Sequence, residues 1–433
     1  MTNPDQHITQ LLVARELKAR LELLSHTIAG NPFLGLPSFT MASTLNTILR
    51  KHAADKEDTK DKVLGASFVV VNKNGVLYSG SAGRIDFPTD AKPWDVDSFT
   101  WVASMTKLIT STAVMKLAES GAVGLDDDVR LVVPQLAELQ ILRGFDSIGQ
   151  PILEENERPI TLRMLLTHTA GMGYDIIEED LSKWAATVER RTNLSATLDG
   201  FTTPLKYVPG EGWSYGTSID WAGQAVEKMV GKTLGEHLSE TIFGPLGMQS
   251  TTFWPEKLGP QVAERTVAWQ VREDDGSLSP GADPRDMGAD AIDSGGAGLW
   301  TTASDYAKFL RALMAGELVS QDTLDDMFAP QLDQRQRAGL QEYADRWKSL
   351  AAEFPPDMPL DHSLAGCVNM RDAQGKRKSG SLQWSGMCNS HWWMDRQTGV
   401  AAVLVVQTQP LGDGVVTKLY DELERAVYGE LLS

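Results

Sequence analysis

The sequence predicts an α/β (α+β) fold. A mainly antiparallel sheet made from both chain ends is flanked by helices and interrupted by an inserted helical region. Two observations carry this prediction. Hairpin patterns lie near the two ends, at 66–81 and 391–407, and apolar residues between them recur at helical spacing. Because strands need partners to bury their apolar faces, these distant hairpins are expected to share one sheet.

The first 60 residues are predicted to form an N-terminal helical extension, 1–60, that packs on the main body. Apolar residues recur at helical spacing on both sides of Pro32 and Pro37, which separate two helical stretches. The main domain is then expected to span 61–433.

The main domain is expected to begin with a β-hairpin. Ala66–Val71 and Val76–Ser81 have strand composition, and a turn containing Asn74 and Gly75 joins them. The expected bounds are about 64–100 and 380–433 for the sheet and about 104–378 for the helical insertion.

Inside the insertion, a helix is predicted to begin near Ser104 and to end at Gly121, where glycine breaks the apolar pattern. Residues 331–378 are polar and poorly patterned, so they are predicted to be a surface excursion. Further helices are predicted at 161–167, 219–230 and 304–315.

The chain ends in a second hairpin and a helix. His391–Asp395 and Gly399–Gln407 are the predicted strands, and a helix at about 414–428 follows with apolar residues on one face. These elements complete the sheet that the first hairpin starts.

Composition excludes several classes of function. The 433 residues carry 40 basic and 58 acidic side chains, a net charge of −18. Such a surface repels phosphate backbones and anionic membranes, so no nucleic-acid and no membrane partner is expected. Only two cysteines occur, Cys367 and Cys388, which excludes a disulfide scaffold. No signal-peptide pattern is visible at the start, so the expected location is cytoplasmic.

No metal and no cofactor is expected. The seven histidines form no HExxH pair, and no GxxxxGK[ST] loop occurs. The glycine-rich run Gly295–Gly298 follows no strand, so we interpret it as a tight turn where backbones approach closely. His168 is interpreted as a hydrogen-bonded core histidine and Cys388 as a small apolar filler.

The first candidate nucleophile is Ser104, in the S-x-x-K motif Ser104-Met105-Thr106-Lys107. Residues three apart share a helix face, so Lys107 would lie one turn from the Ser104 hydroxyl. At a helix start, free N–H groups favour developing negative charge. Because burial disfavours a charged amine, a desolvated lysine can accept the serine proton.

A second serine competes with it. Gly212-Trp213-Ser214-Tyr215-Gly216 matches the G-x-S-x-G nucleophile elbow. That elbow requires a buried strand before the serine, and the residues from Pro209 to Gly212 break a strand. Ser214 is therefore the weaker candidate, and Tyr215 is the residue of interest here, as a phenol that could face Ser104.

These motifs resemble the serine β-lactamase-like superfamily. Within it, the sequence resembles class C β-lactamases and family VIII carboxylesterases, and most closely the fungal lovastatin-type side-chain acyltransferases (transesterases). The resemblance runs from about residue 64 to the C-terminus and implies a β-lactamase/transpeptidase-like fold. Its pieces, in order, are Ser104–Lys107, Ile160–Gly171, Trp213–Gly223, Pro245–Met248, Gly295–Trp300 and Gly380–Gly386.

The resemblance implies a role for each matching residue. Ser104 would be the acylated nucleophile, Lys107 its proton acceptor, and Tyr215 the second base that passes a proton to the leaving group. The backbone N–H groups of Ser104 and Met387 would form the oxyanion hole, which stabilises the charge that develops on the carbonyl oxygen.

Two departures from the family pattern bear on the substrate. Trp384-Ser385-Gly386 stands where β-lactamases have Lys-Thr-Gly, and Thr217 stands where they have an asparagine that binds an acylamino group. Trp384, Ser385, Gly386 and Thr217 would then bind substrate. A tryptophan in place of the lysine offers apolar surface, which favours neutral or hydrophobic esters and thioesters over β-lactams.

The function implied is acyl transfer through an acyl-serine. Its partners would be a small-molecule acyl donor and a water or alcohol acceptor, with an acyl-carrier protein or another thioester as a further donor. A transesterase or carboxylesterase of secondary metabolism is the leading hypothesis. A β-lactamase or D-Ala carboxypeptidase is the alternative within enzymes, and a non-catalytic scaffold or sensor is the alternative outside them.

Overall fold

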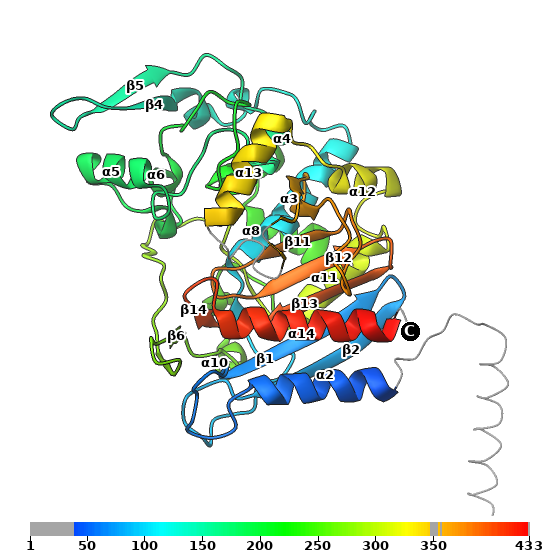
Figure 1. The fold of residues 1–433 in the computed structure, drawn as a ribbon. Helices are drawn as coiled ribbons and strands as arrows, with labels where there is room; N and C mark the ends of the chain where they lie inside the picture. Colours follow the sequence, from blue (N-terminus) through cyan, green and yellow to red (C-terminus); the bar gives the residue numbers. More distant parts are fainter. Residues whose placement is uncertain (1–38, 347–353, 356, 432–433) are drawn as a thin grey trace, which may run out of the picture.

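The computed structural model describes residues 39–346, 354–355 and 357–431, and its centre is a seven-stranded antiparallel sheet (Figure 1). The strand order is β2-β1-β13-β12-β11-β10-β9. Both chain ends therefore contribute to one sheet, as predicted. The strands are β1 (Gly65–Asn72), β2 (Gly75–Gly83), β9 (Leu360–His362), β10 (Cys367–Asn369), β11 (Leu382–Ser385), β12 (His391–Asp395) and β13 (Val400–Val405).

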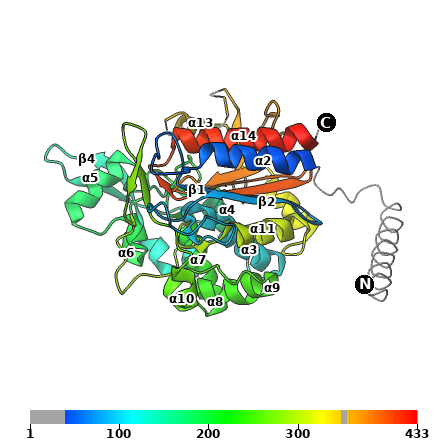
Figure 2. The same ribbon diagram turned by 90° about the horizontal axis from the view of Figure 1, so that it is seen from below.

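Alternate residues of the central strands enter two different cores. In β1, Phe68 and Val70 pack with the helices α2 (Phe39–His52) and α14 (Gly414–Leu431). Val69 and Val71 point to the opposite face and join the larger core under the inserted helices. Figure 2 shows α2 and α14 side by side on one face of the sheet, with α3 and α11 on the other.

The inserted region is mainly helical and covers the second face of the sheet. Its helices are α3 (Thr106–Glu119), α4 (Leu162–Leu166), α5 (Glu179–Val188), α6 (Leu198–Phe201), α7 (Ser218–Val230), α8 (Leu234–Leu238), α9 (Gly244–Leu246), α10 (Pro260–Ala263), α11 (Ala303–Met314), α12 (Gln321–Phe328) and α13 (Gln334–Arg346). Short helical turns are η1 (Ala103–Met105), η2 (Val129–Leu131), η3 (Pro134–Glu138), η4 (Asn193–Ser195), η5 (Ser239–Phe243) and η6 (Pro255–Leu258).

Three small sheets complete the described part of the chain. One pairs β3 with β8, one pairs β4 with β5, and the third has the strand order β14-β6-β7. The bounds are β3 (Thr100–Trp101), β4 (Gln140–Phe145), β5 (Pro151–Glu155), β6 (Gln270–Arg272), β7 (Leu278–Pro280), β8 (Trp300–Thr301) and β14 (Thr408–Gln409).

The predicted surface excursion at 331–378 is wrong. Residues 334–346 form α13, and β9 and β10 extend the central sheet with all six of their residues buried. Each strand is three residues long, which is too short for a period-2 pattern to stand out from the surrounding polar sequence. Of the predicted N-terminal extension, 1–38 lies outside the described residues, and α2 packs against α14 and β2.

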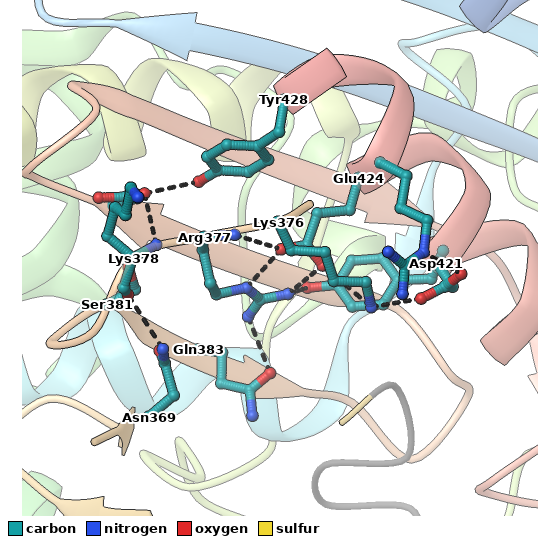
Figure 3. A network of polar contacts seen from close by, with 12 residues as sticks. Asn369, Lys376, Arg377, Lys378, Ser381, Gln383, Asp421, Glu424 and Tyr428 are labelled. Carbon is teal, nitrogen blue, oxygen red and sulfur yellow. Dashed lines mark hydrogen bonds and ion pairs between the residues drawn. The ribbon is translucent and has the colours of Figure 1, made fainter. Parts of the chain in front are cut away.

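A buried ion pair fastens the chain between β10 and β11 to α14 (Figure 3). Arg377 Nε and Nη2 each donate to the Glu424 carboxylate at 2.7 Å, and Nη1 donates to Gln383 Oε1 at 2.9 Å. Lys376 Nζ lies 3.6 Å from the same carboxylate. This network supports the strand that carries Trp384.

None of the helices between residues 39 and 431 that the structure describes is both long and apolar enough to cross a lipid bilayer.

Candidate active site

Ser104 sits on a strained turn at the start of α3. Ala103, directly before it, has a φ of +45°, a left-handed conformation that costs a non-glycine residue of the order of 1–3 kcal/mol. The flanking segment is held by Val102 N–H, which donates to Leu299 O at 3.0 Å, and by Thr106 Oγ1, which donates to Ala103 O at 2.6 Å. Ser104 is half-buried and lines a cavity.

Lys107 lies one turn along α3 with only 5% of its surface exposed. Its Nζ donates to Ser104 Oγ at 3.1 Å, to Tyr174 Oη at 3.1 Å and to Gly296 O at 2.8 Å. The three direct partners of Nζ, two hydroxyl oxygens and one carbonyl oxygen, are uncharged.

Tyr215 reaches Ser104 from the loop before α7. Its Oη donates to Ser104 Oγ at 2.7 Å and accepts from Trp384 Nε1 at 3.2 Å. Lys107 Nζ lies 4.7 Å from the centre of the Tyr215 ring, a cation–π arrangement. The structure thus brings Ser104, Lys107 and Tyr215 together from two segments more than a hundred residues apart.

The cavity in front of Ser104 has a volume of about 330 Å³. Trp384, Ser385, Gly386 and Met387 line it together with Ser104 and Tyr215. Much of the remaining wall is apolar, including Ile177, Leu194, Phe201, Phe253, Met287 and Ile292. A small molecule with an apolar body fits such a wall.

The turn after β11 lies directly against the Ser104 turn. A Cβ on Gly386 would stand 2.4 Å from the Val102 carbonyl oxygen, so only glycine permits this approach. The Met387 N–H makes no hydrogen bond to any residue in the described ranges. It is therefore free to donate to a substrate oxygen in the cavity.

Thr217 is not part of the cavity wall. It is fully buried, and its Oγ1 donates to Phe201 O at 3.3 Å. The structure therefore does not bring Thr217 to the cavity, because its hydroxyl is turned into the core at the start of α7.

The structure also argues against Ser214 as nucleophile. Its Oγ is buried, has no hydrogen-bond partner within the described part of the chain, and does not line the cavity. A serine hydroxyl without a neighbouring base is not activated.

Several groups around Lys107 are held in their neutral forms by burial. Burial, with His362 and Lys107 close by, lowers the pKa of His168 well below its ordinary value. Burial lowers the pKa of His362 to about 4. Burial, with Tyr215 and Asp220, raises the pKa of Tyr174 well above its ordinary value. His168 is buried as predicted, but no described residue accepts or donates at its Nδ1.

Sequence reasoning missed three residues near the nucleophile. Tyr174 contacts Lys107 directly, and Asp220, which also lines the cavity, accepts from Gly296 N–H at 3.0 Å. Tyr174 lies three residues after the motif Ile160–Gly171. Asp220 lies inside the motif Trp213–Gly223, five residues past Tyr215. The spacing of the sequence does not indicate either residue, because only the fold brings them close to Lys107.

The third missed residue is Arg285, which brings a guanidinium group to the cavity wall. The group stacks over Trp101 at 5.0 Å and Trp300 at 5.3 Å from the ring centres. Its Nε and Nη2 donate to the Asp283 carboxylate at 3.0 Å and 2.7 Å. The neighbouring carboxylate offsets this positive charge.

The glycine-rich run is a tight turn, as predicted. A Cβ on Gly295 would lie 2.9 Å from Ile219 O, so the turn presses against α7. Its additional feature is that the Gly296 carbonyl accepts the hydrogen bond from Lys107.

Comparison with known proteins gives a consistent assignment. A family model described as beta-lactamase matches residues 47–426. The chain is 31% identical over 370 residues to a lovastatin esterase of Penicillium rubens, with 82% of this chain and 91% of that protein covered. It is 32% identical over 396 residues to a monacolin J acid methylbutanoyltransferase of Aspergillus terreus, covering 88% and 96%.

Among solved structures, the chain is similar to a LovD6 mutant of the simvastatin synthase from Aspergillus terreus. The TM-score is 0.82 at 28% identity, with 93% of this chain and 100% of that chain covered. The similarity therefore extends over the whole architecture, from the sheet to the inserted helices.

Proposed function

This chain belongs to the beta-lactamase family, and from that premise we propose that it is a serine esterase or acyltransferase in which Ser104 carries the acyl group. The observation that supports the proposal is the direct contact of Ser104 Oγ with Lys107 Nζ at 3.1 Å and with Tyr215 Oη at 2.7 Å. A nucleophile flanked by two proton carriers is the arrangement that covalent acyl transfer requires.

In the first step, Ser104 Oγ bonds to the carbonyl carbon of an ester or thioester and its proton passes to Lys107 Nζ. The N–H groups of Ser104 and Met387 stabilise the oxyanion; one such donor is worth about 3–4 kcal/mol of the barrier. The carbon–oxygen or carbon–sulfur bond to the leaving group then breaks. Tyr215 Oη donates a proton to the leaving group and recovers one from Lys107.

The second step reverses this proton path. Tyr215 passes its proton to Lys107 as it takes one from the attacking water or alcohol, whose oxygen bonds to the acyl carbon. The bond from that carbon to Ser104 Oγ then breaks, and Lys107 returns its proton to Ser104. Water yields hydrolysis and an alcohol yields transfer. The same residues serve both outcomes, so the ratio depends on how completely the bound acceptor excludes water.

The proposed substrate is a hydrophobic ester or thioester of a small molecule from secondary metabolism. The apolar cavity wall and Trp384 in place of a cationic side chain support this choice over a β-lactam or a peptide carboxylate. The relatives point the same way, since one is named as an esterase of lovastatin and one as a methylbutanoyltransferase of monacolin J acid.

A fluorophosphonate probe and p-nitrophenyl butyrate test the proposal. Wild-type protein should be labelled and should hydrolyse the ester. Ser104→Ala should lose the label and about 10³-fold or more in kcat/KM. Ser214→Ala is the matched control and should retain label and most activity, because Ser214 Oγ lies outside the cavity. An active and labelled Ser104→Ala protein would refute the assignment.

Acceptor competition then separates the two outcomes. Acylated enzyme should be supplied with a series of hydrophobic alcohols, and the transferred ester and the free acid should be measured together. Ester formation that rises with alcohol concentration supports a transesterase. Free acid as the sole product across the series would leave only the esterase reading.

A further inference from the structure

Asp220 places a buried carboxylate behind the Lys107 side chain. It lies in the first turn of α7 and is 2% exposed. Its Oδ1 accepts from Ser294 Oγ at 2.5 Å and from Gly296 N–H at 3.0 Å. Burying a charged carboxylate costs free energy unless hydrogen bonds or an opposite charge compensate for the lost hydration.

Gly296 links the carboxylate to the lysine. Its N–H donates to Asp220, and its carbonyl accepts from Lys107 Nζ at 2.8 Å. A Cβ on Gly296 would lie 2.3 Å from Asp220 Oδ2, so the two groups are in close contact. Gly296 therefore connects the carboxylate, through its N–H, to Lys107 Nζ, through its carbonyl.

Other contacts fix the same turn without any charge. Thr110 Oγ1 donates to Gly295 O at 2.7 Å, and Trp101 Nε1 donates to Ala297 O at 2.6 Å. The turn would thus keep two anchors if the carboxylate were made neutral. What the other anchors cannot replace is the negative charge of Asp220.

The titratable groups that face Lys107 come from five segments. Tyr174, Tyr215, His168 and His362 surround it from three loops and from β9, and Asp220 faces it from α7. Burial raises the pKa of Asp220, while Lys107, Ser294 and the Gly296 N–H act in the opposite sense. Burial holds His168 and His362 neutral. Asp220 is the carboxylate of this set, so it is the group that can balance a positive charge on Lys107.

We propose that Asp220 is a positioning residue for the acylation step, with two roles. It orients the Gly296 carbonyl toward Lys107, and its charge stabilises the ammonium ion that forms when Lys107 takes the Ser104 proton. This inference rests on the proposed function, because it assigns Asp220 a part in activating the same serine.

The variant Asp220→Asn tests it, since asparagine keeps the size of the side chain and removes its charge. We expect kcat/KM for p-nitrophenyl butyrate to fall about 10–100-fold with KM changed less than about twofold, because the loss concerns a charge formed during the reaction. The acid limb of the kcat/KM profile should move to lower pH by about half a unit or more, since a neutral neighbour favours the uncharged amine.

Asp293→Asn is the matched control. Asp293 is a buried carboxylate just before the glycine-rich turn at Gly295–Gly298. It accepts from Gly235 N–H at 2.7 Å and from Trp254 Nε1 at 2.6 Å. Loss of a structural carboxylate should lower the melting temperature and leave the acid limb where it is. Equal activity losses with unshifted acid limbs in both variants would overturn the inference and assign Asp220 a structural role alone.

The inference and the proposed function can fail separately. If wild-type Ser104 is labelled by fluorophosphonate and Asp220→Asn is labelled at the same rate with the same pH profile, only the inference falls. An unlabelled wild-type protein overturns both. If Asp220→Asn does not fold, Ser294→Ala removes a hydrogen bond from the carboxylate and should shift the acid limb in the same direction; a wild-type profile there overturns the inference.

Discussion

Trp384 makes two separate contacts at the site, one through its ring and one through its N–H group. Its ring forms part of the cavity wall, and its Nε1 donates to Tyr215 Oη at 3.2 Å. A donor at this oxygen stabilises the phenolate character that Tyr215 gains while it passes a proton. The residue therefore contacts the proposed proton carrier and also lines the cavity that we propose binds the substrate.

Trp384→Phe should consequently lower kcat/KM for p-nitrophenyl butyrate by about 5–10-fold, the equivalent of one hydrogen bond of about 1 kcal/mol. Trp392→Phe is the control, because Trp392 pairs with Trp384 across the sheet while its buried Nε1 has no partner in the described part of the chain. It loses the same volume and no hydrogen bond. Equal losses of activity in the two variants would contradict the role of the Trp384 N–H.

Among single residues, the sequence predicts those that belong to a recognisable motif. It does not predict those that only tertiary packing brings to the site. Ser104 and Lys107 lie one helical turn apart, so their contact follows from local geometry, and the resemblance indicates Tyr215. Asp220 and Tyr174 reach Lys107 only through tertiary packing. The resemblance indicates Thr217 as a substrate-binding residue, but the structure turns its side chain into the core, because side-chain direction at the start of a helix depends on how that helix packs.

The elements that could be predicted are those with long periodic patterns. The strands at 66–81 and 391–407 and the helices α3, α7, α11 and α14 all have enough residues for alternation or a 3.6-residue period to be visible. β9 and β10 have three residues each and are defined by their pairing instead, since β10 pairs with β11 and β9 pairs with β10. Their position at the edge of the sheet is a tertiary property.

One helix also depends on a charge that sequence patterning does not predict. Glu424 of α14 is fully buried against Arg377 and Lys376. Glu424→Gln removes the carboxylate that pairs with the buried Arg377, while Lys376 keeps its ion pair with Asp421. The variant should lower the free energy of unfolding by about 3–5 kcal/mol in urea titrations. Glu422→Gln, on the same helix but partly exposed, pairs with Lys51 and should cost less than about 1 kcal/mol. Similar midpoints for both variants would contradict this.

For the whole molecule, buried histidines make stability fall in acid. Burial, with Arg377 and Lys376 nearby, lowers the pKa of His391 from 6.5 to about 3, and burial lowers that of His362 from 6.5 to about 4. The unfolded chain therefore binds protons that the folded chain does not bind. Stability is fully present above pH 6.5 and is lost as the pH falls below it toward these folded values.

Thermal melts between pH 7 and pH 4.5 should show this decline as a falling melting temperature. His391→Phe should flatten the curve, because phenylalanine preserves the ring that stacks on Tyr420 at 4.4 Å and has no proton to bind. An unchanged slope in this variant would show that His391 contributes nothing to the acid sensitivity.

The central sheet places Val69 of β1 opposite Val403 of β13. During synthesis at roughly 5–20 residues per second, one edge of the emerging hairpin thus waits tens of seconds for the strand that completes it. Until then it exposes unpaired amides beside an apolar surface, an arrangement prone to wrong pairing with other nascent chains. A holdase chaperone that covers this edge during synthesis should therefore raise the yield of folded protein.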